Sequence, residues 1–274
     1  MKEEKIIDVK RLIASKNPRL AKWLPGFIIR FLRRILHEEE LNIFLNRTKE
    51  VKNIDFCDAS AEFLHMKVKI LGLENIPKEG PIILVMNHPF GGLDALALVS
   101  ALRGHREDLK FIVNDILMNL TNLADLFVGV NKHGKNEKST RQQIMDVFES
   151  SHAVCVFPAG MVSRKIDGEV RDLEWKKTFV TYAKKLNQPI IPIHVDGKLS
   201  NFFYRLSNFR KFLGIKANIE MIYLVHELIK LRGTTVTLTV GKVILPETLN
   251  TDQSEKALAQ EIKAKIYELS ATKN

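Results

Sequence analysis

Six short apolar runs recur through the middle of the chain, and segments with helical periodicity lie between most of them. Short runs rich in β-branched residues are typical of buried strands, and strands that alternate with helices build βαβ units. The sequence therefore predicts an α/β fold with a mostly parallel central sheet flanked by helices. The expected strands are 66–71, 82–86, 109–114, 126–130, 153–157 and 190–195, and the expected helices lie near 93–103, 115–125, 139–150 and 171–186.

Two further segments follow these units. Residues 234–245, TTVTLTVGKVIL, alternate apolar and polar side chains, which predicts an antiparallel or edge strand. A polar amphipathic helix is expected from Asp252 over 252–273. We predict one domain over residues 53–274, with its motif-bearing core at about 65–245.

Residues 1–52 differ from this domain in charge. Between Lys10 and His37 there are eight lysines or arginines and no carboxylate. Pro18 and Pro25 divide the region into short pieces, which predicts a helix–turn–helix. Within GFIIRFLRRILH, an apolar stripe lies opposite a basic face. The stripe comprises Phe27, Ile28, Phe31, Leu32, Ile35 and Leu36, and the basic face comprises Arg30, Arg33, Arg34 and His37.

This amphipathic segment has two interpretations. In one it is an interfacial membrane anchor, with the stripe among acyl chains, the arginines against anionic headgroups and Trp23 at the lipid–water boundary. In the other the stripe packs on the protein's own core. Nucleic acid is disfavoured as a partner because no nucleic-acid motif accompanies the charge.

Composition supports a cytoplasmic, membrane-associated protein. The net charge of +10 suggests a polyanionic partner, such as an anionic membrane surface or an acidic carrier protein. Cys57 and Cys155 have apolar neighbours, as buried thiols of a reducing compartment do. We see no signal peptide and no apolar stretch long enough to cross a bilayer, so we expect a peripheral protein without a transmembrane span.

The segment NHPFGGLD, residues 87–94, follows one of the expected buried strands and opens a helix. It can be a simple turn in which Asp94 caps the helix. Alternatively His88 is a general base whose imidazole is oriented by Asp94. In that case Gly91 and Gly92 allow the backbone to approach a substrate, with N–H groups that stabilise an oxyanion.

A second loop, FPAGMVSRK over 157–165, also follows an expected buried strand. Parallel strands that end together place the two loops at one edge of the sheet. The loop is a common kind of turn, but Ser163 and Arg164 offer a hydroxyl and a cation there.

Two other kinds of site are disfavoured. Residues 129–135, GVNKHGK, match the spacing of a phosphate-binding loop, but Asn136 stands where a Mg²⁺-binding Ser or Thr is needed. The histidines other than His88 show no metal-ligand spacing, so we predict no metal site and no bound cofactor.

Taken in order, these motifs resemble those of the glycerolipid acyltransferases, which include the 1-acylglycerol-3-phosphate acyltransferases. The resemblance covers roughly residues 65–245 and implies that His88 deprotonates an acceptor hydroxyl, which attacks an acyl thioester, while Asp94 orients His88. It also matches Phe157, Pro158, Ala159 and Gly160 to the acceptor-binding block and 191–193 to the late apolar block. Asn87, Gly91, Gly92, Ser163 and Arg164 are predicted to contact substrate as well.

Three departures from the family pattern bear on the acceptor. His88 and Asp94 are spaced H-x5-D, one residue longer than usual. Ala159 replaces the usual glutamate, and Arg164 lies two positions late. Lys132 stands in for the arginine that binds the acceptor's phosphate in the family. The pattern is closer to a haemolysin-like branch that acylates lyso-ornithine and related aminoacyl lipids.

The sequence thus predicts a peripheral O-acyltransferase on the cytoplasmic face of the inner membrane, with a lysolipid acceptor and acyl-carrier protein or acyl-CoA as donor. The alternatives are a 1-acylglycerol-3-phosphate acyltransferase, a non-catalytic lipid-binding protein and a thioesterase.

Overall fold

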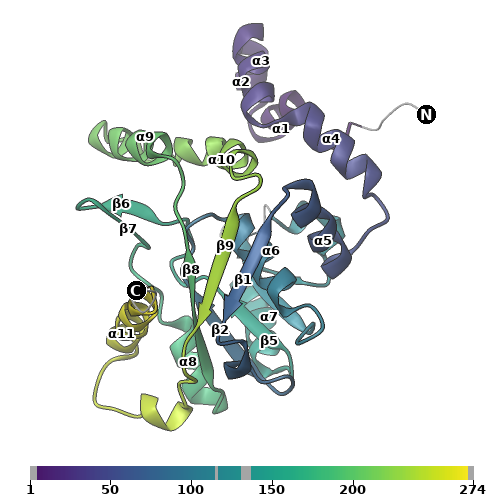
Figure 1. The fold of residues 1–274 in the computed structure, drawn as a ribbon. Helices are drawn as coiled ribbons and strands as arrows, with labels where there is room; N and C mark the ends of the chain where they lie inside the picture. The colour runs from purple at the N-terminus through teal and green to yellow at the C-terminus, as the bar shows by residue number, and fades with distance from the viewer. Residues whose placement is uncertain (1–4, 115–116, 131–136, 271–274) are drawn as a thin grey trace. The chain divides into compact units, whose positions relative to one another are not determined.

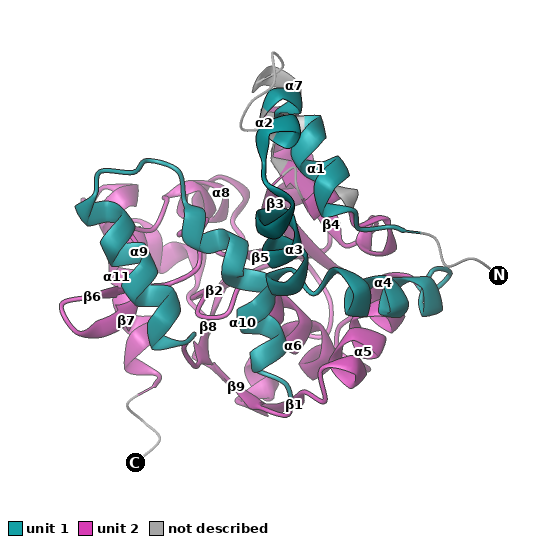
Figure 2. Ribbon diagram, turned by 90° about the horizontal axis from the view of Figure 1, so that it is seen from above, with its two compact units in different colours: residues 1–51, 199–232 teal, residues 52–198, 233–274 magenta. Residues whose placement is uncertain are grey.

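The computed structural model describes residues 5–114, 117–130 and 137–270, and the chain divides into two compact units. Unit 1 contains residues 1–51 and 199–232, and unit 2 contains residues 52–198 and 233–274. Figure 2 colours the two units separately. Each unit therefore combines stretches that are far apart in the sequence.

Unit 2 is built on a seven-stranded sheet with the order β1-β9-β8-β2-β5-β3-β4. All neighbouring strands are parallel except β8 and β9, which confirms the prediction of a mostly parallel α/β sheet. The strands are β1 (Lys67–Leu71), β2 (Ile82–Met86), β3 (Leu109–Asn114), β4 (Phe127–Val130), β5 (Ala153–Val156), β8 (Ile190–Asp196) and β9 (Thr235–Val240).

Strand β9 contains the alternating sequence TVTLTV. It runs antiparallel to β8, as expected, but it pairs in parallel with β1 on its other side and is therefore an interior strand. Its apolar members Val236, Leu238 and Val240 are buried, whereas the threonines between them are less so. The strand alternates because its two faces differ in burial.

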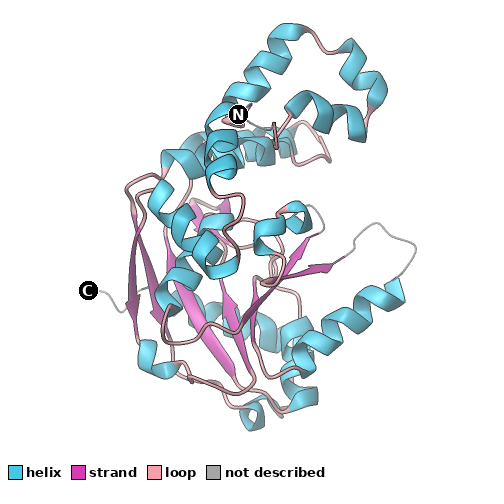
Figure 3. Ribbon diagram, turned by 90° about the vertical axis from the view of Figure 1, so that its right-hand side faces the viewer, coloured by secondary structure: helices cyan, strands magenta, loops and turns pink. Residues whose placement is uncertain are grey.

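Helices cover both faces of the sheet (Figures 1 and 3). Helix α6 packs against β1 and β9, and α5 packs against α6. Helix α8 contacts β2, and α11 contacts β8. The helices are α5 (Asn53–Phe63), α6 (Gly92–Leu102), α7 (Glu137–Glu149), α8 (Thr178–Leu186) and α11 (Glu255–Glu268), with short 3₁₀ helices at Leu73–Asn75, Leu117–Asn119, Thr121–Leu123 and Pro246–Leu249.

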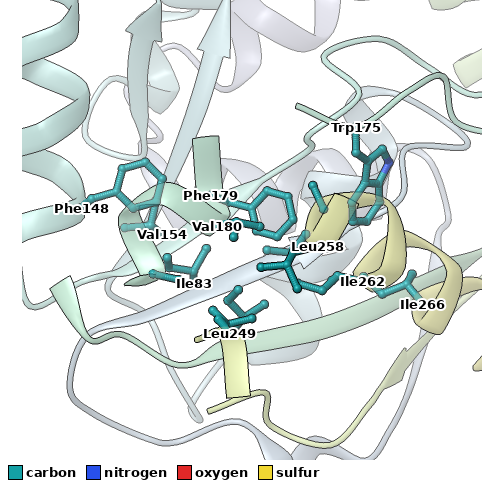
Figure 4. Packing of buried hydrophobic residues seen from close by; sticks show 14 of the residues in the cluster. Ile83, Phe148, Val154, Trp175, Phe179, Val180, Leu249, Leu258, Ile262 and Ile266 are labelled. Atoms are coloured by element: carbon teal, nitrogen blue, oxygen red, sulfur yellow. The ribbon is translucent and has the colours of Figure 1, made fainter. Parts of the chain in front are cut away.

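The core beneath α8 and α11 joins residues from both ends of unit 2 (Figure 4). Ile83 and Val154 from the sheet meet Phe179 of α8 and Ile262 of α11, and all four are buried. Burial of a side chain as large as Phe179 contributes about 1.5–3 kcal/mol. The C-terminal helix is therefore part of the core that supports the sheet.

One predicted helix was wrong, and another starts later than predicted. The described part of 115–125 forms short 3₁₀ turns, and its Asn and Thr residues have low helix propensity. The helix predicted over 171–186 begins only at Thr178, since a hairpin of β6 (Arg164–Ile166) and β7 (Glu169–Arg171) precedes it. Its turn is Asp167-Gly168, with φ of 49° and 87°, the positive values that a two-residue hairpin turn needs.

Unit 1 is helical and contains α1 (Val9–Lys16), α2 (Pro18–Trp23), α3 (Gly26–Ile35), α4 (Glu38–Arg47), a 3₁₀ helix at Ile219–Tyr223, α9 (Asn201–Phe212) and α10 (Leu224–Lys230). The breaks at Pro18 and Pro25 agree with the predicted division into short helices. The predicted boundary at residue 52 separated an N-terminal segment alone, whereas the compact unit also includes residues 199–232.

Polar contacts join the two stretches of unit 1. His37 Nε2 lies 2.9 Å from His226 Nδ1, and Arg232 pairs with Glu40. Glu38 is buried and accepts from Val9 N at 2.9 Å, while its other oxygen meets Arg33 at 2.8 Å. Arg33, predicted to face lipid headgroups, pairs with Glu38, and its side chain is 49% exposed.

The apolar stripe of α3 is divided between core and solvent. Ile35 is buried and Ile28 is half-buried, but Phe27 is 63% exposed and Phe31 49% exposed. Trp23, Arg30 and Arg34 are also exposed. Among the described residues, no helix has the length and apolar character that a membrane span requires.

Candidate active site

The two predicted loops leave the sheet at the same edge. Strands β2 and β5 are parallel neighbours with Val85 opposite Val156, so the loops that follow them begin side by side. The backbone joins them directly, because Ser163 N donates to His88 O at 2.8 Å. The structure thus brings NHPFGGLD and FPAGMVSR together, at the carboxyl ends of strands where ligands bind in open α/β sheets.

His88 and Asp94 are in contact despite their longer spacing. His88 Nδ1 lies 2.9 Å from Asp94 Oδ2, and Asp94 is fully buried. The extra residue is accommodated at Gly91, whose φ of 84° and ψ of −128° suit only glycine. Helix α6 begins at Gly92, so Asp94 lies in its first turn and still faces the histidine.

Backbone donors hold the Asp94 carboxylate. Phe90 N and Gly91 N donate to Oδ2 at 3.1 and 3.0 Å. Burial raises the pKa of Asp94 above its ordinary value, while His88 and the two N–H groups oppose that rise. Of the two glycines expected to offer N–H groups to an oxyanion, Gly91 donates its N–H to Asp94 instead.

The ring of Phe157 packs against the imidazole of His88. The two ring centroids are 4.1 Å apart, and Phe157 itself lies 6.5 Å from Phe111 of β3. The His88 side chain remains 18% exposed. With Nδ1 directed to Asp94, Nε2 is the nitrogen left to act on a substrate.

The rest of the FPAG segment shapes the turn. Gly160 N donates to Phe157 O at 2.9 Å, and Gly160 has φ of 65°. Pro158 and Ala159 are buried, and Ala159 belongs to the core beneath α8. Of the four residues predicted to bind the acceptor, Phe157 therefore touches the histidine, and Gly160 is exposed.

Asp172 is a site residue that the sequence did not reveal. Its Oδ1 accepts from His88 N at 3.2 Å and from Ser163 Oγ, and its Oδ2 accepts from Trp175 Nε1 at 2.9 Å. The side chain is buried. Asp172 thus links the two loops through His88 N and Ser163 Oγ. No motif marks it, because its partners come from separate stretches of chain.

The C-terminal helix contacts the backbone of the same residue. Asp172 N donates to Tyr267 Oη at 2.8 Å, and Lys263 Nζ donates to Asp172 O at 2.7 Å. Burial and then the charge of Asp172 raise the pKa of Tyr267. Burial also lowers the pKa of Lys263, although Asp172 opposes the decrease. Helix α11 therefore supports the loop geometry as well as the core.

A cavity of about 190 Å³ is lined in part by Asn87 and Pro89, the two neighbours of His88 in the chain. Its walls come from the loops after β2 and β5, from the end of β8 and from α11. The lining residues are Asn87, Pro89, Ser163, Val170, His194, Val195, Asp196, Gly197, Tyr267 and Ser270. Most of this lining is polar, so the cavity suits a small polar group rather than an acyl chain.

For three residues predicted to contact substrate, the structure shows a different arrangement from the one expected. The Asn87 side chain exchanges hydrogen bonds with the backbone of Val195, at 2.8 and 2.7 Å, and so ties β2 to β8. Arg164 is 1% exposed and donates to Val162 O at 2.7 Å. Gly92 is exposed at the start of α6. Lys132 lies outside the described residues.

The described residues contain no group of His, Cys, Asp and Glu side chains arranged to hold a metal ion. The chemistry that the site offers is that of an imidazole with a buried carboxylate partner. Such a pair takes a proton from a hydroxyl and stabilises the imidazolium that forms.

The family model described as "Acyltransferase" matches residues 11–273. The chain belongs to this acyltransferase family. It is similar to the lyso-glycine lipid O-acyltransferase of Bacteroides thetaiotaomicron, with 42% identity over 96% of this chain and 97% of the relative. The corresponding protein of Phocaeicola vulgatus is 41% identical over 96% of this chain and 95% of the relative.

The fold of this acyltransferase is also similar to a solved structure. The 1-acyl-sn-glycerophosphate acyltransferase of Thermotoga maritima matches with a TM-score of 0.52 and 19% identity, over 96% of each chain. At that identity the likeness concerns the fold. It supports the α/β architecture and does not identify the acceptor lipid.

Proposed function

We propose that this acyltransferase transfers a fatty acyl group from an acyl thioester to the hydroxyl of a lyso-aminoacyl lipid, with lyso-glycine lipid as the first candidate. The observation that carries the proposal is the contact between His88 and Asp94 in a chain that is similar over nearly its whole length to lyso-glycine lipid O-acyltransferases. The sequence favoured a lyso-ornithine type of acceptor, and the relatives support the aminoacyl class.

His88 acts as the general base in the proposed reaction. Its Nε2 takes the proton of the acceptor hydroxyl as the oxygen attacks the thioester carbonyl. A C–O bond forms, the C–S bond breaks, and the departing thiolate takes the proton back from the imidazolium. Asp94, 2.9 Å from Nδ1, fixes the ring orientation and stabilises its cationic form.

The surroundings of His88 suit transfer rather than hydrolysis. Phe157 covers one side of the ring and Asp94 is shielded from water. Restricting water matters, because a water molecule at Nε2 converts acyl transfer into thioester hydrolysis. The donor is expected to be acyl-carrier protein or acyl-CoA, both of which are anionic and match the net charge of +10.

Membrane binding by residues 1–52 is part of the proposal. Trp23, Phe27 and Phe31 are exposed apolar side chains within a segment rich in arginine and lysine. That combination supports an interfacial position on the cytoplasmic leaflet, where the lysolipid is concentrated.

The test is an assay of the purified chain with a labelled acyl thioester and three acceptors: lyso-glycine lipid, lyso-ornithine lipid and 1-acylglycerol-3-phosphate. We expect diacyl product with the aminoacyl lipids, detected by mass spectrometry, and none with His88→Ala. Product with 1-acylglycerol-3-phosphate alone would contradict the aminoacyl-lipid acceptor and indicate a 1-acylglycerol-3-phosphate acyltransferase. Fatty acid release at an equal rate without acceptor would indicate a thioesterase, and lipid binding without turnover a binding protein.

A further inference from the structure

Residues 199–222 of unit 1 carry a second surface that is both apolar and basic. From Leu199 to Ile219 there are four lysines or arginines and no carboxylate. Three of these cations, Arg205, Lys211 and Lys216, are exposed. Large apolar side chains are exposed among them: Phe202, Phe209, Phe212, Leu213, Ile215, Ile219 and Ile222. An exposed apolar group of this size marks an interaction surface.

Some apolar residues of α9 are exposed because a different face of the helix is the buried one. Phe203, Tyr204, Ser207 and Arg210 are buried at the spacing of one helical face. Arg210 is held by the buried Glu220 at 2.8 Å. Phe209 and Phe212 lie outside that face and are 59% and 84% exposed.

The same surface is continuous with the N-terminal helices of unit 1. The ring of Tyr223 lies 5.0 Å from that of Phe202 and 6.4 Å from that of Phe31, edge to face in both cases. Tyr223 therefore joins α9 to α3, the helix predicted to bind lipid. Figure 2 shows both stretches in the colour of unit 1.

We propose that residues 201–222 form a second membrane-binding element, which inserts Phe209, Phe212 and Leu213 into an anionic bilayer. Lys211 and Lys216 then meet the lipid headgroups. The inference rests on the proposed function, since a lysolipid acceptor and a diacyl product both reside in a membrane. Bilayer rather than carrier protein is the occupant because extended apolar side chains stand between the cations.

The first test is co-sedimentation with vesicles of phosphatidylethanolamine and phosphatidylglycerol. Phe209→Ser with Phe212→Ser should lower the vesicle partition coefficient at least about tenfold, given the transfer free energy of two phenylalanines. Lys211→Gln with Lys216→Gln should lower it by about fivefold for each cation removed and weaken its dependence on salt. The matched control is Leu245→Ser, which removes an apolar side chain that is 52% exposed in unit 2.

Insertion can be read directly by tryptophan fluorescence. The two native tryptophans are Trp23 and the buried Trp175. In a Trp23→Phe background, Phe212→Trp should be quenched by brominated acyl chains, whereas Trp175 should not. The proposal is overturned if position 212 is not quenched, or if the phenylalanine variants partition like wild type. A raised KM for acyl-carrier protein with unchanged partition would assign the surface to that protein instead.

Failure of this inference and failure of the proposed function are distinguishable. Acyl transfer by the wild-type chain in detergent micelles tests the function, and vesicle partition tests the surface. Thermal denaturation in the absence of lipid checks that each variant is folded.

Discussion

Replacing Asp94 with asparagine tests whether the buried carboxylate stabilises a charged His88. The substitution conserves size, and its amide oxygen can still accept from Phe90 N and Gly91 N. It removes the negative charge that lies 2.9 Å from His88 Nδ1. A carboxylate and an imidazolium at that separation interact by about 6 kcal/mol at an effective dielectric constant of roughly 20.

That interaction exists only while the imidazolium is present, so its loss raises the free energy of the transition state and leaves that of the ground state unchanged. About 6 kcal/mol corresponds to a decrease in kcat of about 10,000-fold. The measurement is the initial rate of acyl transfer to lyso-glycine lipid at saturating acceptor. A decrease of less than about tenfold would refute the role assigned to Asp94. Asp58→Asn, at an exposed ion pair with Arg103, is the matched control and should retain its rate.

The same variant should not lose stability. Because burial raises the pKa of Asp94 in the folded state, the ionised side chain lowers the free energy of unfolding at pH values above that pKa. This cost is absent below the unfolded-state pKa and develops as pH rises. Asp94→Asn removes it, so we expect an unchanged or higher melting temperature at neutral pH. A large decrease in melting temperature would show that the carboxylate is needed for folding.

Three further predictions concern the supports of the site. Asp172→Ala leaves three donors, two of them buried side chains, without their acceptor and should lower the free energy of unfolding by about 3–5 kcal/mol in denaturant titrations; a loss below about 1 kcal/mol would contradict the network. Gly197→Ala should destabilise by about 3 kcal/mol, because a Cβ there comes within 1.8 Å of the Phe90 ring and φ is 153°; Phe90→Ala in the same chain should restore part of that loss. Burial raises the pKa of the Cys57 thiol to about 12 and raises that of Cys155, so neither should react with Ellman's reagent until the chain is unfolded, and rapid native labelling would contradict this.

The sequence determined the class of fold through local patterns. Apolar runs such as IILVM and AVCV are buried on both faces in the structure, which is why they could be recognised without knowing their neighbours. The order of the NHPFGGLD and FPAG motifs likewise indicated the family. The Asp167-Gly168 hairpin was also readable from its turn residues, and its omission led to the wrong start for α8.

Tertiary structure decided what depends on residues distant in the chain. The contact of His88 with Asp94 required an unusual backbone conformation at Gly91 that spacing alone does not specify. Asp172 entered the site because hydrogen bonds from two loops and from α11 converge on it, although its local sequence carries no signal. The union of 1–51 with 199–232 rests on contacts such as His37 with His226, which are 189 residues apart. The periodicity of a sequence reflects which face of each helix or strand is buried. Which distant side chains meet in a site is determined only when the helices and strands pack together.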